Sequence, residues 1–274
     1  MSKKKILKLL SSIILMLVVL LYHNVLVKAE NITDTTKDKT YQIDLNQDGK
    51  EEKIKLKQYA VDDEGYNFYG IVYVDGKKAY TTPKDAYGYG IDMKLITCGK
   101  QVFINVSQNT DNGIGVFNKL LYFNGKTLEE AIDFIKVESC VRDCLITSVT
   151  EDKIVVSCDA MPCQLASIMW KSTYLVEGNT VKIKSYIHKV KSGNENRSIS
   201  TLVTNRTVTF TSKIGSKKIA FKLGVGKKVK LLSITTKGEK VYGYFQYGKK
   251  KGYLRVDPYY NTAYFKNVYK YLAG

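Results

Sequence analysis

The sequence predicts an all-β protein, in which an antiparallel β body, propeller-like or a sandwich, precedes a small and strongly basic β domain. Three observations support this prediction. Apolar and polar residues alternate with a period of two over short stretches, which is typical of half-buried strands. Asp-Gly and Asn-Gly pairs separate many of these stretches, as tight turns require. Positive charge is concentrated at the C-terminal end, because residues 189–274 contain 19 Lys or Arg and only 3 Asp or Glu.

The first 29 residues are typical of a secretory signal peptide. Residues 3–8 contain four lysines, and residues 9–21 form an apolar run interrupted only by two serines. Val27-Lys28-Ala29 then places small residues at positions −3 and −1 of a cleavage site before Glu30. An uncleaved membrane anchor is the alternative, but the apolar run is shorter than the ~20 residues that span a bilayer. We therefore expect residues 1–29 to be removed and the secreted chain to have no membrane span.

The remaining chain divides into an expected all-β body at residues 40–190, a polar linker at 191–198 and a basic domain at 199–274. Residues 127–137 have some helical spacing but could equally form a strand. The other body segments show strand patterns: 52–59, 69–74, 94–97, 102–106, 116–123, 145–149, 154–158, 168–176 and 181–187.

The cysteines can be tested against strand geometry. Two β-branched runs joined by the polar residues 150–152 predict a β-hairpin. If Val149 faces Lys153 across its turn, Cys144 lies opposite Cys158. Cys140 and Cys163 then nearly face each other further along the ladder, and the fifth cysteine has no evident partner. Cross-strand disulfides are therefore allowed by geometry. Two alternatives stay open, namely buried reduced thiols and a four-thiolate zinc site, for which the cysteine spacings are a loose match.

A loop in the body carries a possible calcium-binding pattern. Asp44, Asn46, Asp48 and Glu52 supply side-chain oxygens at positions 1, 3, 5 and 9 of a calcium-type loop, and Gly49 occupies position 6. Position 12 holds a lysine, and strand patterns flank the loop where an EF-hand has helices. The segment resembles the hairpin loop of FG-GAP/VCBS-type extracellular β repeats, and the resemblance implies calcium held between two strands. The alternative is a metal-free polar turn, because Asn, Asp and Gly also favour turns.

Two stretches near the C-terminus resemble the two halves of a bacterial SH3-like (SH3b) domain. Residues 216–232 contain an apolar strand, a glycine-containing turn and a second strand, as the first half does. Residues 241–256 resemble the second half, with Tyr242 and Tyr253 where the family usually has tryptophan. The resemblance covers residues 206–256. It implies a small barrel and, as in many secreted bacterial proteins, binding to peptidoglycan or association with the cell wall.

Alternation within this segment predicts which side chains face inward and which face outward. The expected core residues are Val229, Leu231, Phe245, Tyr247 and Leu254. The candidate ligand-binding residues are Lys227, Lys228, Lys230, Tyr242, Lys249, Lys250, Lys251 and Tyr253. Exposed lysines attract anionic polymers, and tyrosine rings suit stacking on sugars. The alternative is structural, because tyrosine favours strands and edge lysines suppress aggregation.

The sequence favours a binding protein over an enzyme. His188 is the one histidine after the signal region, and we expect it at the surface. The nucleophile-elbow, zinc-protease and phosphate-loop motifs are all missing. Nucleic acid would also satisfy the charge, but the expected export argues against it as a physiological partner. We therefore expect a secreted, cell-envelope-associated protein that binds peptidoglycan or an anionic wall polymer. The alternative is an extracellular protein–protein interaction module in which the barrel is purely structural.

Overall fold

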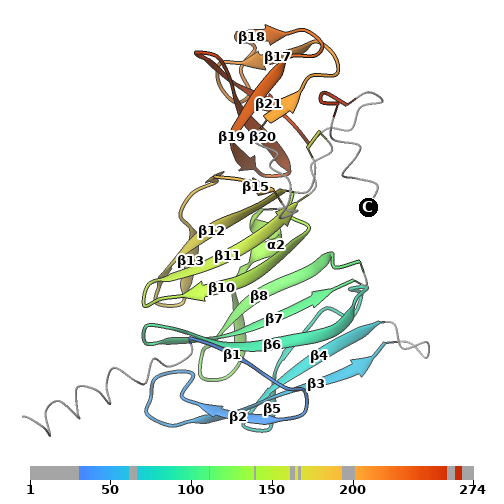
Figure 1. The fold of residues 1–274 in the computed structure, drawn as a ribbon. Helices are drawn as coiled ribbons and strands as arrows, with labels where there is room; N and C mark the ends of the chain where they lie inside the picture. Colours follow the sequence, from blue (N-terminus) through green and yellow to red (C-terminus); the bar gives the residue numbers. More distant parts are fainter. Residues whose placement is uncertain are drawn as a thin grey trace, which may run out of the picture. The chain divides into compact units, whose positions relative to one another are not determined.

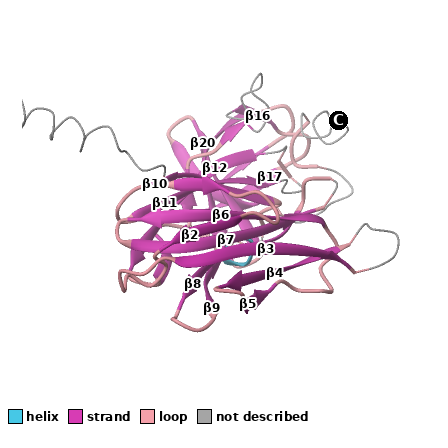
Figure 2. Ribbon diagram, turned by 90° about the horizontal axis from the view of Figure 1, so that it is seen from below, coloured by secondary structure: helices cyan, strands magenta, loops and turns pink. Residues whose placement is uncertain are grey.

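The computed structural model describes residues 31–61, 67–110, 112–138, 140–160, 164–165, 168–192, 201–257 and 263–266. Residues 32–274 belong to one compact unit, and the expected signal peptide lies outside the described residues. Antiparallel strands dominate (Figure 2), and α2 (Phe134–Val137) is the one helix of the described part. This part contains no helix that is long and apolar enough to cross a membrane. The prediction of an all-β fold is therefore confirmed.

Two antiparallel sheets pack face to face in the first half of the unit (Figure 1). The first sheet has the order β2-β3-β4-β5, with strands β2 (Thr40–Ile43), β3 (Glu52–Ala60), β4 (Phe68–Val74) and β5 (Lys77–Thr81). The second has the order β1-β6-β7-β8-β9, with strands β1 (Ile32–Asp34), β6 (Tyr89–Cys98), β7 (Gln101–Asn109), β8 (Gly115–Phe123) and β9 (Leu128–Asp133). Ile54 and Val72 of the first sheet share one apolar core with Ile104 of the second. Alternate residues pointing into this interface explain the period of two in the sequence.

A third sheet covers the other face of the second one. Its order is β10-β11-β12-β13, with β15 also paired to β12: β10 (Asp143–Val149), β11 (Lys153–Ala160), β12 (Ile168–Glu177), β13 (Thr180–Ile183) and β15 (Lys191–Ser192). Phe103 and Leu120 of the second sheet share a core with Tyr174 of the third, and Phe134 packs edge-on against Tyr174 at 4.8 Å between ring centroids. The second sheet is thus buried on both faces, and the body is a stack of three sheets.

The C-terminal sheet is open within the described residues, although the family resemblance implied a closed barrel. Its order is β14-β19-β20-β21-β17-β18, with β16 also paired to β19: β14 (Ile187–His188), β16 (Thr201–Val203), β17 (Val208–Thr211), β18 (Ile219–Leu223), β19 (Lys228–Lys237), β20 (Lys240–Tyr247) and β21 (Lys250–Arg255). No hydrogen-bonded ladder joins β14 to β18, the two ends of this order. Phe210 stacks on Phe221 at 4.4 Å and contacts Phe245 edge-on at 5.3 Å. These rings fill the inner side of the sheet.

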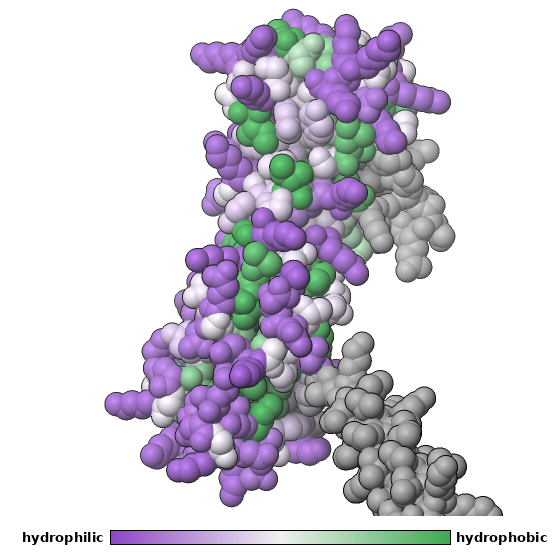
Figure 3. Space-filling model, turned by 90° about the vertical axis from the view of Figure 1, so that its left-hand side faces the viewer, coloured by the Kyte–Doolittle hydropathy of each residue, from purple (hydrophilic) through white to green (hydrophobic). Residues whose placement is uncertain are grey.

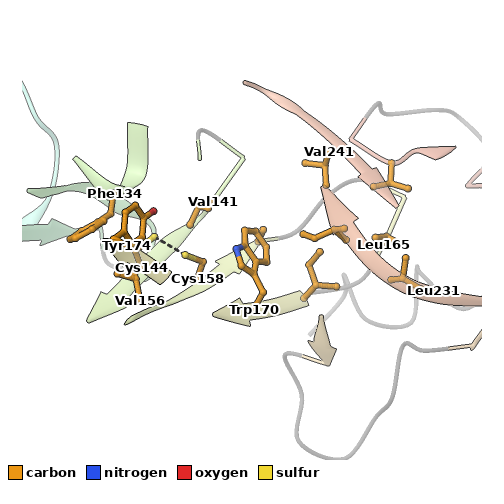
Figure 4. Packing of buried hydrophobic residues seen from close by; sticks show 14 of the residues in the cluster. Phe134, Val141, Cys144, Val156, Cys158, Leu165, Trp170, Tyr174, Leu231 and Val241 are labelled. Atoms are coloured by element: carbon orange, nitrogen blue, oxygen red, sulfur yellow. Dashed lines mark hydrogen bonds between the residues drawn. The ribbon is translucent and has the colours of Figure 1, made fainter. Parts of the chain in front are cut away.

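The apolar core is continuous from the third sheet to the C-terminal sheet. Figure 4 shows Trp170 of β12 on the side of the body that faces Leu231 and Val241 of the C-terminal sheet, and all three belong to one buried cluster. The backbone also crosses the expected domain boundary, because Ile187 and His188 pair with β19. Experiments on the C-terminal sheet therefore need the whole chain from residue 30 onward.

Two segments are divided differently from the sequence expectation. Residues 127–137 form the strand β9 followed by α2, whose N-terminus is capped by Asp133 accepting a hydrogen bond from the Ile135 amide at 3.2 Å. The stretch 181–187, expected as one strand, instead ends at β13 and resumes as β14 in a different sheet. Most of the expected linker, residues 193–198, lies outside the described residues.

Candidate functional site on the C-terminal sheet

Strand alternation separates the two faces of β19, β20 and β21 as the sequence predicted, with one exception. Val229, Leu231, Phe245 and Leu254 are buried. Tyr247 was expected in the core but is 38% exposed. It is the last residue of β20, beside the tight turn at residues 248–249, so its side chain extends beyond the edge of the core.

The outer face of these strands carries three cross-strand rows, given by the register. Lys230, Gln246 and Lys251 form the first row, Ser233, Tyr244 and Tyr253 the second, and Thr235, Tyr242 and Arg255 the third. In the middle row, Tyr244 and Tyr253 stack with 4.5 Å between ring centroids and 29° between ring planes. The tyrosines are half-buried, so each ring keeps an exposed part. We call these three rows the tyrosine face.

Six predicted lysines are exposed around this face, and Figure 3 shows hydrophilic side chains projecting from the C-terminal region. Two sit in or beside the β18–β19 turn, two in or beside the β20–β21 turn, and two in the first row: Lys227, Lys228, Lys249, Lys250, Lys230 and Lys251. None of the six forms an ion pair with a carboxylate of the described residues. Arg255, in contrast, is paired with Asp257 at 2.7 Å. No described carboxylate therefore neutralises the positive charge of these lysines by direct pairing.

The structure adds Tyr244 and Gln246 to the predicted set. They lie on β20 two and four residues after Tyr242, so they share its face. The same alternation that selected Tyr242 could have found them. Tyr244 matters most, because its stacking on Tyr253 makes a two-ring surface from residues nine apart in sequence.

The predicted calcium loop joins β2 to β3, two paired antiparallel strands, as expected. The Asp44 carboxylate accepts hydrogen bonds from the amides of Asp48 at 3.2 Å and Gly49 at 2.9 Å. Asn46 Oδ1 accepts the Asp48 amide at 3.0 Å. Glu52 is buried, and its Oε2 accepts the Leu45 amide at 2.7 Å across the base of the loop. The loop is thus folded by its own oxygen side chains, with Gly49 at a φ of 86°, which favours glycine.

The calcium ligand set is only partly brought together. Within the described residues, no three His, Cys, Asp or Glu side chains converge as a metal cluster. Asp44, Asn46 and Asp48 all turn into the loop, and carboxylate oxygens that accept one hydrogen bond keep a second lone pair. These three fit the oxygen chemistry of calcium, whereas the carboxylate of Glu52 is held at the loop base.

The prediction that His188 lies at the surface is wrong. It is 3% exposed, and its ring stacks on Trp170 at 5.3 Å. Its Nε2 lies 2.7 Å from Oε1 of Glu138, which is fully buried. This distance is that of an ion pair, although the ring N–H is not aligned for a hydrogen bond. Sequence reasoning missed Glu138, because nothing in its local pattern marks it as buried.

Glu138 also binds hydroxyl groups from two other elements. Thr236 of β19 donates to Oε1 at 3.0 Å, and Ser172 of β12 donates to Oε2 at 2.6 Å. Burial raises the pKa of Glu138, but His188, Ser172 and Thr236 together lower it, and the balance lies below its ordinary value. Ser172 contacts the carboxylate rather than His188, so the arrangement differs from a serine–histidine catalytic pair. The cluster joins the body to the C-terminal sheet.

No protein-family model, curated protein or solved structure matches this chain. The proposals below therefore depend on the residues and their geometry.

Proposed function

We propose that this protein is secreted and non-enzymatic, and that its tyrosine face attaches to peptidoglycan or to an anionic polymer of the bacterial cell wall. The observation that carries the proposal is the stacked pair Tyr244 and Tyr253 beside Lys230 and Lys251, on an exposed sheet face. Aromatic rings on a rigid sheet provide a flat apolar surface for a sugar ring. The adjacent lysines provide charge for phosphates or carboxylates.

The charge distribution supports an extended anionic partner. The exposed lysines have no described counter-charge, so they act together on a polymer at distances up to the Debye length, about 8 Å at physiological salt. Charge alone gives binding that weakens steeply as salt rises. Stacking on tyrosine is much less sensitive to salt, so the two contributions can be separated experimentally.

The test is co-sedimentation of the chain from residue 30 onward with bacterial sacculi, with and without their anionic polymers, over a salt series. Reversing the charge of Lys228, Lys230 and Lys251 to Glu should abolish retention at low salt. The matched control reverses three exposed body lysines, Lys77, Lys78 and Lys126, which makes the same change in net charge. Equal loss in both variants would contradict a specific face and leave only net charge.

The tyrosines are tested separately with Tyr253→Ala and Tyr244→Ala. We expect either change to lower retention on stripped sacculi at moderate salt by about tenfold, if a stacking contact contributes about 1.4 kcal/mol. If retention is lost when the anionic polymer is removed and is unchanged by either tyrosine substitution, the polymer is the partner. No sedimentation of the wild-type chain at low salt would overturn wall binding and favour the protein–protein interaction alternative. The binding part would then be the mildly acidic body, since residues 30–188 contain 19 Lys or Arg and 23 Asp or Glu.

We further propose that calcium, when bound, stiffens the β2–β3 loop through Asp44, Asn46 and Asp48. Calcium would supply a counter-charge to the two carboxylates there and would take no part in a reaction. Titration calorimetry with millimolar calcium should give heat for the wild-type chain and none for Asp48→Ala. Absence of heat for the wild type would leave the loop as a metal-free turn.

A further inference from the structure

Two cysteines of the third sheet face each other across neighbouring strands. Cys144 of β10 and Cys158 of β11 are direct partners in the register, and their sulfur atoms lie 3.3 Å apart. Both are buried, with exposed fractions of 3% and 0%. Figure 4 shows the two sulfurs pointing toward one another beside Tyr174 and Val141.

The separation is that of two thiols in contact, since a disulfide bond is about 2.05 Å long. Closing it needs an approach of little more than one ångström, which small side-chain rotations on two facing strands can supply. The strand register is already correct, so the backbone need not shift its pairing. Direct pairing of the two residues and a sulfur–sulfur distance of 3.3 Å fit the short reach that a disulfide requires.

We propose that Cys144 and Cys158 form a disulfide while the chain folds, before the β10–β11 hairpin is covered by the rest of the core. The two thiols together lose two protons and two electrons, and a sulfur–sulfur bond forms between them. The oxidant is a small-molecule or protein disulfide, which is reduced to two thiols as it accepts the electrons and protons. One cysteine first forms a mixed disulfide with the oxidant. The other cysteine then attacks the sulfur of its partner and releases the reduced oxidant as a thiol.

Burial explains why the bond must form early. Disulfide exchange needs a thiolate and access for the oxidant. The contact with Cys158 raises the pKa of Cys144, and burial and the nearby Glu138 carboxylate raise it further. Cys158 is fully buried, and its sulfur lies 3.8 Å from Oε2 of Glu138. Once the fold is complete, Cys144 does not ionise readily, and both sulfurs are buried away from an oxidant.

The other described cysteines differ from this pair. Cys98 contacts the carbonyl oxygen of Thr150 at 3.1 Å. Cys140 is half-buried, and burial raises its pKa to about 12. Its expected partner, Cys163, lies outside the described residues. Cys144 and Cys158 are therefore the described pair whose geometry supports a bond.

The test compares two orders of folding and oxidation, using the chain from residue 30 onward. In the first arm, reduced and denatured protein refolds in a glutathione redox buffer and is then alkylated. In the second arm, the protein folds under reducing conditions before the same buffer is added. Trypsin without reductant releases Cys144 on residues 143–153 and Cys158 on residues 154–171. The second peptide also holds Cys163, so fragmentation between residues 158 and 163 assigns the bond.

We expect the refolding arm to yield the two peptides joined through Cys158 and two hydrogens lighter than their sum. The folded arm should form the same bond at least tenfold more slowly. Cys98→Ala should leave the linkage intact, and Cys144→Ala should abolish it. Alkylation of both Cys144 and Cys158 after refolding would overturn the disulfide. Equal rates in the two arms would overturn the conclusion that it must form before burial.

Discussion

Replacing Glu138 by Ala should strongly destabilise the fold. Its carboxylate is fully buried, lies 2.7 Å from Nε2 of His188, and accepts hydrogen bonds from Thr236 at 3.0 Å and Ser172 at 2.6 Å, so it contacts three strands. Alanine leaves a buried imidazole without the carboxylate beside it and two hydroxyls without their acceptor. The affected strands include β12 of the body and β19 of the C-terminal sheet, so the change acts on both regions.

The expected loss is about 3–5 kcal/mol, the usual cost of removing one partner from a buried ion pair. For a chain of this size, each kcal/mol lowers the thermal midpoint by about 2–4 °C, so the midpoint should fall by roughly 6–20 °C. Glu138→Gln keeps the volume and one acceptor oxygen for the hydroxyl groups. We therefore expect a smaller loss of about 1–3 kcal/mol for Gln.

Thermal and urea unfolding followed by circular dichroism measure these losses. The control is Glu51→Ala, an exposed carboxylate on the β2–β3 loop, which should change stability by less than about 0.5 kcal/mol. In the double variant Glu138→Ala with His188→Ala, neither the imidazole nor the carboxylate is left buried without the other, so its loss should be smaller than the sum of the two single losses. A loss below about 1 kcal/mol for Glu138→Ala, or strict additivity in the double variant, would refute the reasoning.

Three further predictions concern acid stability, packing and the β2–β3 loop. The pKa of Glu138 in the folded protein is below its ordinary value of 4.5, so its contribution to stability is present above that value and is lost as pH falls through the lowered pKa. Urea midpoints measured across this acid range should fall less steeply for Glu138→Gln than for the wild type, and identical slopes would contradict this. Gly243→Ala should cost about 1–3 kcal/mol, because a Cβ there would lie 2.3 Å from Cε2 of Phe245. Gly224→Ala, which meets open space, should be near neutral in the same melting assay. Asp44→Ala removes the acceptor of two backbone amides and should cost about 1–3 kcal/mol; an unchanged melting midpoint would show that the loop holds its shape without it.

Most strands could be predicted from the local sequence, because apolar and polar residues alternate along an amphipathic strand and so indicate which face is buried. Facing cysteines were predicted from hairpin geometry, and Cys144 does face Cys158. The pairing next to the hairpin turn was predicted wrongly, since Val149 faces Ile154 rather than Lys153. A register shift between residues 146 and 148 explains the difference, and such irregularities leave no clear periodic signal.

The sequence by itself determined the all-β class, most strand positions and the local concentration of positive charge, since each depends on residues that are neighbours in the chain. Only the tertiary structure decided that His188 is buried, that Glu138 is its partner, and that Ile187 and His188 leave the body to pair with β19. Glu138 meets groups 34, 50 and 98 residues away. Contacts over such separations are set by how whole sheets pack, which no local pattern records.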